Sequence, residues 1–266
     1  MVSSPPSDRS RSLGALLSPL QELTRSYPGL EGAVVGEFVC DGRRYVMPRY
    51  RLRGPETGPT PIRLGLFAGV HGDEDAGCTA LCEFLAALAA NPSDASGYDL
   101  WVYPVCNPAG YEAGIRENGT GKDLNREFWR DSAEPEARIL EAELLARRFQ
   151  GIIALHADDT CDGVYGYAHG RLLNEALLGP ALRAAAGVLP LDPRSTIDGF
   201  PAKGGVIHEC FCGVLAPPPG QRPRPFDLIF ETPALAPFDR QVQAHVLALD
   251  TILAEYRKFI AYAQHL

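Results

Sequence analysis

The sequence predicts an α/β fold, in which a three-layer α/β/α sandwich surrounds a mixed, largely parallel central sheet. Short apolar runs alternate with helical segments of about 12 residues or more, a pattern that implies parallel strands covered on both faces. An early pair of strands flanks Asp41–Gly42, a common tight turn, so a hairpin makes the sheet mixed. The 266 residues, 45% hydrophobic and 22% charged, fit one domain with a large core.

The first half of the chain predicts a hairpin followed by alternating strands and helices. Residues 1–10 contain Ser, Pro and Asp in place of an apolar pattern, and we expect a flexible tail there, followed by a single domain over residues 11–266. The expected elements are a hairpin of Gly32–Cys40 and Arg43–Leu52, a loop at Arg51–Thr60, a strand at Ile62–Ala68, a helix at Asp75–Ala90 and a strand at Tyr98–Val105.

The second half continues the same alternation. The expected elements are a helix at Glu134–Gln150, a buried strand at Gly151–Leu155, a helix at Leu172–Ala186, strands at Gly204–Cys212 and Phe226–Phe230, and a long closing helix at Phe238–Tyr262. The prolines of Ala216–Pro225 exclude a helix and favour an extended loop.

Charge and cysteine usage exclude several classes of protein. A net charge of −8 argues against nucleic acid as a partner, and no polybasic run suggests a membrane surface. No apolar run reaches the roughly 18–20 residues that span a bilayer, and the N-terminus does not resemble a signal peptide. Seven cysteines, an odd number, fit free thiols in the cytoplasm better than a disulfide framework. A thiolate metal site at Cys78–Cys82 or Cys210–Cys212 is the weaker alternative.

Two predicted strand ends carry residues that can bind a metal. His71 and Glu74 follow the strand that ends at Ala68, and His156 follows the strand that ends at Leu155. Because the carboxyl ends of parallel strands meet at one edge of a sheet, the three side chains form a candidate His₂Glu zinc site. One of Asp73 and Asp75 is expected to cap the following helix or to hydrogen-bond a metal ligand, and neither is expected to be a ligand itself.

A glycine-rich segment between these ligands is dense in planar hydrogen-bonding groups. It runs from Asn107 to Phe128 and contains Arg116, Asn125 and Arg126. A guanidinium binds a carboxylate through two hydrogen bonds and an Asn amide adds a neutral donor, so the segment suits an anionic ligand. A solvated surface loop is the alternative when the segment is considered alone.

Four motifs, in this order, resemble the zinc carboxypeptidase superfamily. They are HGDE at 71–74, NPAGYEAGIRENGTGKDLNREF at 107–128, LHADD at 155–159 and FETP at 230–233. The superfamily includes carboxypeptidases of the A type, murein-peptide amidases, and the succinylglutamate desuccinylase and aspartoacylase branch. The resemblance implies a single catalytic domain with an α/β/α sandwich.

The resemblance also implies a role for each motif residue. His71, Glu74 and His156 match the ligands of one Zn²⁺ per chain. Arg116 matches the arginine that polarises the scissile carbonyl, and Glu231 matches the general base. Asn125 and Arg126 match the pair that holds the terminal carboxylate of the substrate.

One feature of large carboxypeptidases is missing. They place a tyrosine in a mobile loop before the catalytic glutamate, but residues 204–230 contain no tyrosine. His208, Tyr165 or Tyr167 could take this role, or no residue does.

Three functions follow from this pattern. The first is a metallocarboxypeptidase, a metallopeptidase that hydrolyses an amide bond beside a free carboxylate in a small peptide. The second is an N-acyl amino-acid deacylase of the same superfamily. The third, a non-catalytic zinc-binding module, would require a missing ligand or base, and the sequence lacks neither. The side chain that the substrate carries and the oligomeric state are left open.

Overall fold

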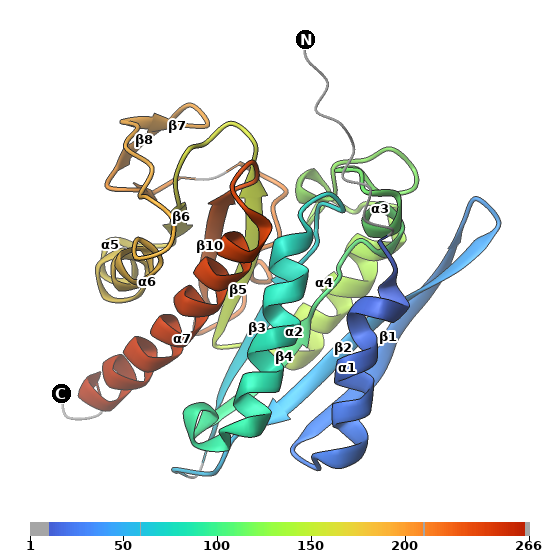
Figure 1. The fold of residues 1–266 in the computed structure, drawn as a ribbon, viewed down its shortest axis with the longest axis horizontal. Helices are drawn as coiled ribbons and strands as arrows, with labels where there is room; N and C mark the ends of the chain where they lie inside the picture. Colours follow the sequence, from blue (N-terminus) through green and yellow to red (C-terminus); the bar gives the residue numbers. More distant parts are fainter. Residues whose placement is uncertain (1–10, 59, 210, 264–266) are drawn as a thin grey trace.

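The computed structural model describes residues 11–58, 60–209 and 211–263. Within these residues a ten-stranded sheet has the order β1-β2-β4-β3-β5-β10-β6-β9-β8-β7 (Figure 1). The strands are β1 (Leu30–Cys40), β2 (Arg43–Arg53), β3 (Ile62–Ala68), β4 (Tyr98–Tyr103), β5 (Gly151–Asp158), β6 (Tyr165–Ala168), β7 (Thr196–Ile197), β8 (Phe200–Lys203), β9 (Val206–Ile207) and β10 (Phe226–Pro233).

Helices cover both faces of this sheet. They are α1 (Leu13–Ser26), α2 (Asp75–Ala90), α3 (Pro108–Ala113), α4 (Pro135–Arg147), α5 (Arg171–Leu173), α6 (Gly179–Ala185) and α7 (Phe238–Ala263), with short helical turns η1 (Pro92–Ala95), η2 (Leu124–Arg126) and η3 (Asn174–Leu178). In Figure 1, α2 and α7 lie in front of the sheet and α4 lies behind it. The predicted α/β/α sandwich is confirmed. Among the described residues, no helix is both long and apolar enough to cross a bilayer.

The sheet is mixed, as predicted, and its centre is parallel. Strands β4, β3, β5 and β10 run parallel to one another, whereas β2 pairs antiparallel with both β1 and β4. Beyond β10, the short strand β6 is antiparallel to it. The carboxyl ends of the four central strands therefore meet at one edge, where the motif residues lie.

Two core clusters hold the layers together. The larger lies between the sheet and helices α1, α2, α6 and α7, and includes Leu20, Phe84 and Leu249. The smaller lies between the sheet and α4, and includes Phe67 and Leu140. Because apolar side chains leave the sheet on both faces, the central strands have continuous apolar sequences such as Gly151–Leu155.

Several element boundaries differ from the sequence prediction. Strand β5 continues to Asp158 and β10 to Pro233, so His156 and Glu231 lie within strands. The strand expected at Gly204–Cys212 is wrong over most of its length, since only Val206–Ile207 is extended. Gly204 and Gly205 take positive φ angles that break the strand, Cys212 lies in a turn, and Cys210 lies outside the described residues.

Some of the observed elements are not predicted from the sequence. Helix α1 and strand β6 are absent from the prediction because α1 contains Pro19 and β6 has only four residues. The helix expected at Leu172–Ala186 is a continuous helical segment that includes the π-turn η3 between α5 and α6.

The aromatic cluster around Phe67 should contribute strongly to stability. Phe67 is fully buried, stacks on Tyr103 with ring centroids 4.6 Å apart, and meets Phe149 edge-on at 6.2 Å. Phe67→Ala should reduce the free energy of unfolding by about 3–5 kcal/mol, because it removes these contacts and leaves a cavity. Urea denaturation measures this, with Tyr262→Ala as a control, because Tyr262 is 67% exposed and should change stability by less than about 0.5 kcal/mol. Equal effects of the two substitutions would contradict the prediction.

Candidate metal site

The loop between β3 and α2 has a backbone that only glycine permits at two positions. Gly69 has φ of +62°, a left-handed conformation. A Cβ on Gly72 would lie 2.0 Å from the carbonyl carbon of Gly110, so any side chain there would force the two loops apart. These glycines let the chain turn sharply after the strand and bring His71 and Glu74 to the carboxyl edge of the sheet.

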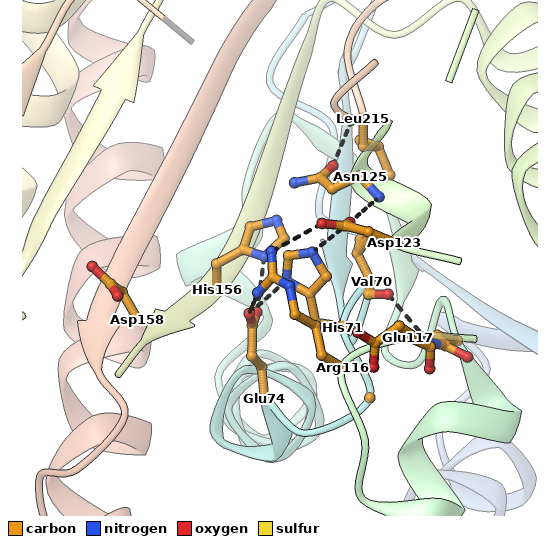
Figure 2. Close-up of polar contacts among 12 residues, drawn as sticks. Val70, His71, Glu74, Arg116, Glu117, Asp123, Asn125, His156, Asp158 and Leu215 are labelled. Atoms are coloured by element: carbon orange, nitrogen blue, oxygen red, sulfur yellow. Dashed lines mark hydrogen bonds and ion pairs between the residues drawn. The ribbon is translucent and has the colours of Figure 1, made fainter. Parts of the chain in front are cut away.

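His71, Glu74 and His156 converge on one point, as Figure 2 shows. Glu74 Oε1 lies 2.5 Å from His71 Nδ1, and Glu74 Oε2 lies 2.8 Å from His156 Nδ1. One donor atom from each residue lies within 4.8 Å of the others, and all three side chains are buried. Among the described residues, this is the only such group of histidine, cysteine and acidic side chains.

The charge balance of this group fits a divalent cation. A buried carboxylate needs a nearby positive charge, and here both of its oxygens face imidazole nitrogens. Burial lowers the pKa of His71, but the charge of Glu74 and the hydrogen bonds to Asp123 and Glu74 together outweigh this and raise the pKa to about 9. The geometry therefore requires positive charge between the rings and Glu74, which protons or a metal can supply. Two imidazoles and a carboxylate are a donor set that suits Zn²⁺.

Asp123 links His71 to Arg116. Its Oδ1 lies 3.1 Å from His71 Nε2, and its Oδ2 accepts a hydrogen bond from Arg116 Nη2 at 3.2 Å. Burial raises the pKa of Asp123, but the hydrogen bond and charge of His71, with Arg116, hold it well below its usual range. A carboxylate on the second ring nitrogen fixes the orientation of the imidazole and leaves Nδ1 free for a metal.

A hydrogen bond to a metal ligand was expected of Asp73 or Asp75, but Asp123 makes this contact with His71. The N-cap position of α2 is occupied by Glu74, Asp75 lies in the first turn, and Asp73 is exposed. Asp123 is not among the site residues predicted from the sequence, because the prediction from the DLNR motif used only Asn125 and Arg126. The acidic residue at the start of that motif was the feature that could have indicated its role.

Arg116 lies beside Glu74, on a loop that is stabilised by hydrogen bonds of its own residue Asn118. Its Nη1 is 3.5 Å from Glu74 Oε1. The loop is organised by the buried Asn118, whose Nδ2 donates to Glu134 Oε2 at 2.6 Å and whose Oδ1 accepts from the backbone N–H of Lys122 at 2.9 Å. These hydrogen bonds hold the glycine-rich loop in one conformation and so fix the position of Arg116 beside the site.

Asn125 and Arg126 lie on the same side of the pocket but are held differently. Asn125 Oδ1 accepts a hydrogen bond from the backbone of Leu215 at 2.9 Å (Figure 2). The guanidinium of Arg126 stacks on Phe211, 4.5 Å from the ring centroid. No carboxylate of the described residues lies within ion-pair distance of it. Arg126 is therefore a cation that lines the pocket without an anionic partner.

Glu231 reaches the site from the sheet. It lies opposite His156 in the parallel pairing of β10 with β5, so the two side chains leave the same face of adjacent strands. Burial raises the pKa of the Glu231 carboxyl well above its ordinary value, and the negative charge of Glu74 raises it further.

The three residues considered in place of the missing loop tyrosine lie in different surroundings. Tyr165 lies opposite Glu231 in the β6–β10 pairing, is 2% exposed, and donates a hydrogen bond to Asp158 Oδ2 at 3.1 Å. Tyr167 also lines the pocket. His208 is exposed, contacts Asn174 and does not line the pocket.

The site opens into one cavity of about 420 Å³. His71, Glu74, Arg116, Asn125, Arg126 and Glu231 line it. Four further carboxylates lie on its wall, from Asp73, Asp158, Asp159 and Asp198. The cavity is therefore cationic near Arg116 and Arg126 and carries a surplus of negative charge elsewhere.

Comparison with known protein families gives one partial match. Residues 61–162 match the succinylglutamate desuccinylase/aspartoacylase catalytic domain. This range contains His71, Glu74 and His156 but ends before Glu231. Comparison with curated protein sequences gives no match.

Solved structures resemble most of the chain. A predicted metallopeptidase of Shewanella denitrificans is 26% identical, with a TM-score of 0.77 over 96% of this chain and 98% of that one. A predicted metallopeptidase of Shewanella baltica is 27% identical, with a TM-score of 0.75 over 92% of both chains. A metallo-carboxypeptidase of Burkholderia cenocepacia shares the fold at 20% identity, with a TM-score of 0.68 over 92% of this chain and 68% of that one.

Asp123 offers a test of the site that is independent of the substrate. Asp123→Asn keeps the size of the side chain but removes the charge that orients His71, so metal affinity should fall about 10- to 100-fold. His71→Ala should abolish stoichiometric binding. Zn²⁺ competition with a chromophoric chelator measures both, and Asp131→Asn, which changes an exposed acid, serves as control. An Asp123→Asn variant with wild-type affinity would contradict the prediction.

Proposed function

We propose that this chain is a zinc-dependent metallocarboxypeptidase of the zinc carboxypeptidase-like superfamily, which its partial match to a desuccinylase/aspartoacylase catalytic domain and its similarity to metallopeptidase structures support. In this proposal it hydrolyses an amide bond beside a free carboxylate in a small peptide. One observation carries it: His71 and Glu74, which form a buried group with His156, line a single cavity together with Glu231 and Arg126, which has no ion-pair partner among the described residues. The site draws on residues 71–231, which supports one catalytic domain over residues 11–266.

Each residue has a defined part in the proposed reaction. His71, Glu74 and His156 would hold one Zn²⁺, which supplies Lewis-acid chemistry when it is bound. Glu231 takes the proton from the attacking water and delivers it to the leaving amine. Arg116 donates hydrogen bonds to the carbonyl oxygen as negative charge develops there.

The substrate carboxylate is assigned to Asn125 and Arg126. The Oδ1 of Asn125 is occupied by Leu215, which fixes the side-chain amide so that its Nδ2 is the group left to bind a ligand. The guanidinium of Arg126 is positioned by Phe211 and by its hydrogen bond to the Asn125 carbonyl at 2.8 Å. A carboxylate would satisfy both groups and neutralise the charge of Arg126.

An N-acyl amino-acid deacylase is the second candidate, because residues 61–162 match a desuccinylase/aspartoacylase catalytic domain. The cavity wall favours the peptidase. A succinyl group carries a second carboxylate, which Asp73, Asp158, Asp159 and Asp198 would repel. A peptide carries a free ammonium group, which the same aspartates would attract. A direct comparison of a dipeptide with the matching N-succinyl amino acid separates the two functions.

Glu231→Gln tests the proton-transfer role. The substitution keeps the shape of the side chain and removes the proton acceptor, so kcat should fall by about 100-fold or more while zinc content is unchanged. Elemental analysis and steady-state kinetics measure the two effects. The control is Glu117→Gln, which alters an exposed carboxylate that does not line the cavity. Near-normal turnover in Glu231→Gln would move the base to another residue.

Arg126→Ala tests the link between the enzyme and a free carboxylate. Loss of one partner of a buried charge pair costs roughly 2–5 kcal/mol, which corresponds to a fall in kcat/KM of about 30-fold or more. Amidation of the substrate carboxylate should impair the wild-type enzyme to a similar degree. Because both changes remove the same contact, their combined effect should be far smaller than the product of the two.

The control for this experiment is Arg138→Ala, which removes an exposed arginine of α4 and should leave both substrates unaffected. The carboxypeptidase assignment fails if the wild-type enzyme cleaves the amidated peptide as well as the free acid. Arg126 would then be a structural residue.

A further inference from the structure

Arg11, the first residue that the structure describes, lies against the loop that carries His71 and Glu74. Its Nη1 donates to the carbonyl of Gly72 at 2.9 Å, and its Nη2 donates to the carbonyl of Asp73 at 3.3 Å. Its Nε lies 3.4 Å from Asp75 Oδ2. Only 14% of the side chain is exposed, which is low for an arginine.

The loop needs such support because of the place that Glu74 takes in helix α2. Glu74 is the N-cap residue, yet its side chain makes no capping hydrogen bond. Its carboxylate faces His71 and His156 instead. The beginning of the helix therefore lacks the usual side-chain cap, and its orientation depends on other contacts.

Arg11 can provide this support because the residues that follow it are anchored. Ser12 is the N-cap residue of α1, and its Oγ accepts a hydrogen bond from the backbone of Ala15 at 3.3 Å. Leu17 and Leu20 bury that helix in the larger core cluster. The Arg11 backbone is thus held at one end of a packed helix, so its contacts require no further ordering of the backbone.

The same guanidinium lies near the beginning of the Arg116 loop. A Cβ added to Gly114 would lie 3.6 Å from Arg11 Nη1. The backbone N–H of Gly72 donates to the carbonyl of Arg116 at 3.3 Å. Arg11 therefore contacts the metal-ligand loop at the point where that loop meets the Arg116 loop.

We propose that Arg11 is a positioning residue that fixes the His71–Glu74 loop for metal binding. A guanidinium is required because its planar fork reaches two successive carbonyls while Nε faces Asp75, an arrangement that the ammonium of lysine cannot reproduce. The inference rests on the proposed metal site but not on the identity of the substrate.

The test measures metal affinity in the full-length protein. Arg11→Met keeps most of the apolar stem and should raise the Kd for Zn²⁺ about 10-fold or more, as loss of an outer-shell contact does at other metal sites. Arg11→Lys should have a smaller effect, but it should still raise the Kd by more than about two-fold, because lysine cannot reproduce the contacts of the guanidinium. Arg25→Met, which changes an exposed arginine in the last turn of α1, is the matched control. The visible spectrum of Co²⁺-substituted protein reports changes in ligand geometry that a general loss of stability would not cause.

A Kd in Arg11→Met within about two-fold of the wild-type value would overturn the inference, even if the metal-free variant melts at a lower temperature. Arg11 would then be a purely structural residue. If Arg11→Met does not fold, Arg11→Lys decides the question by the same criterion. Failure of the wild-type protein to bind Zn²⁺ would contradict the proposed function itself, and metal binding without peptide hydrolysis would contradict only the substrate assignment.

Discussion

The carboxylate of Glu74 is the constraint on which the site depends. It is buried between the imidazoles of His71 and His156, and so joins the loop after β3 to the interior of β5. A buried carboxylate is stable only with nearby positive charge, which explains why Arg116 also lies within 3.5 Å. Asp123 then balances Arg116 and orients His71. Each charged group in this network is therefore paired with a neighbouring group of opposite charge.

The register of the sheet determines the other half of the site. Glu231 and His156 are paired across β10 and β5, and Tyr165 is paired with Glu231 across β6 and β10. Neighbouring strands are about 4.8 Å apart, so these separations are fixed by backbone hydrogen bonds rather than by flexible loops. A one-residue slip would turn Glu231 to the opposite face, where Thr232 now contacts His245 of α7.

The sequence predicted the groups that depend on strand ends, but not those that depend on packing between distant segments. His71, Glu74 and His156 could be placed together because parallel strands share a carboxyl edge. No sequence periodicity indicates that Asp123 turns toward His71. That contact depends on the conformation of the loop that the hydrogen bonds of Asn118 stabilise. The short strands β6 to β9 were missed or misjudged because positive-φ glycines and brief pairings leave no regular pattern.

Some site residues lie on strands and others lie in loops. This difference also explains how proteins with similar folds can act on different substrates. His156, a proposed metal ligand, and Glu231 lie on paired central strands, where a change of spacing would disturb the core. Asn125 and Arg126 instead lie in a short turn that is tied by single contacts to Leu215 and Phe211. Such contacts are lost or replaced without disturbing the sheet. Substrate preference can therefore change while the hydrolytic chemistry is retained, and the charge on the cavity wall is more informative about the substrate than the fold is.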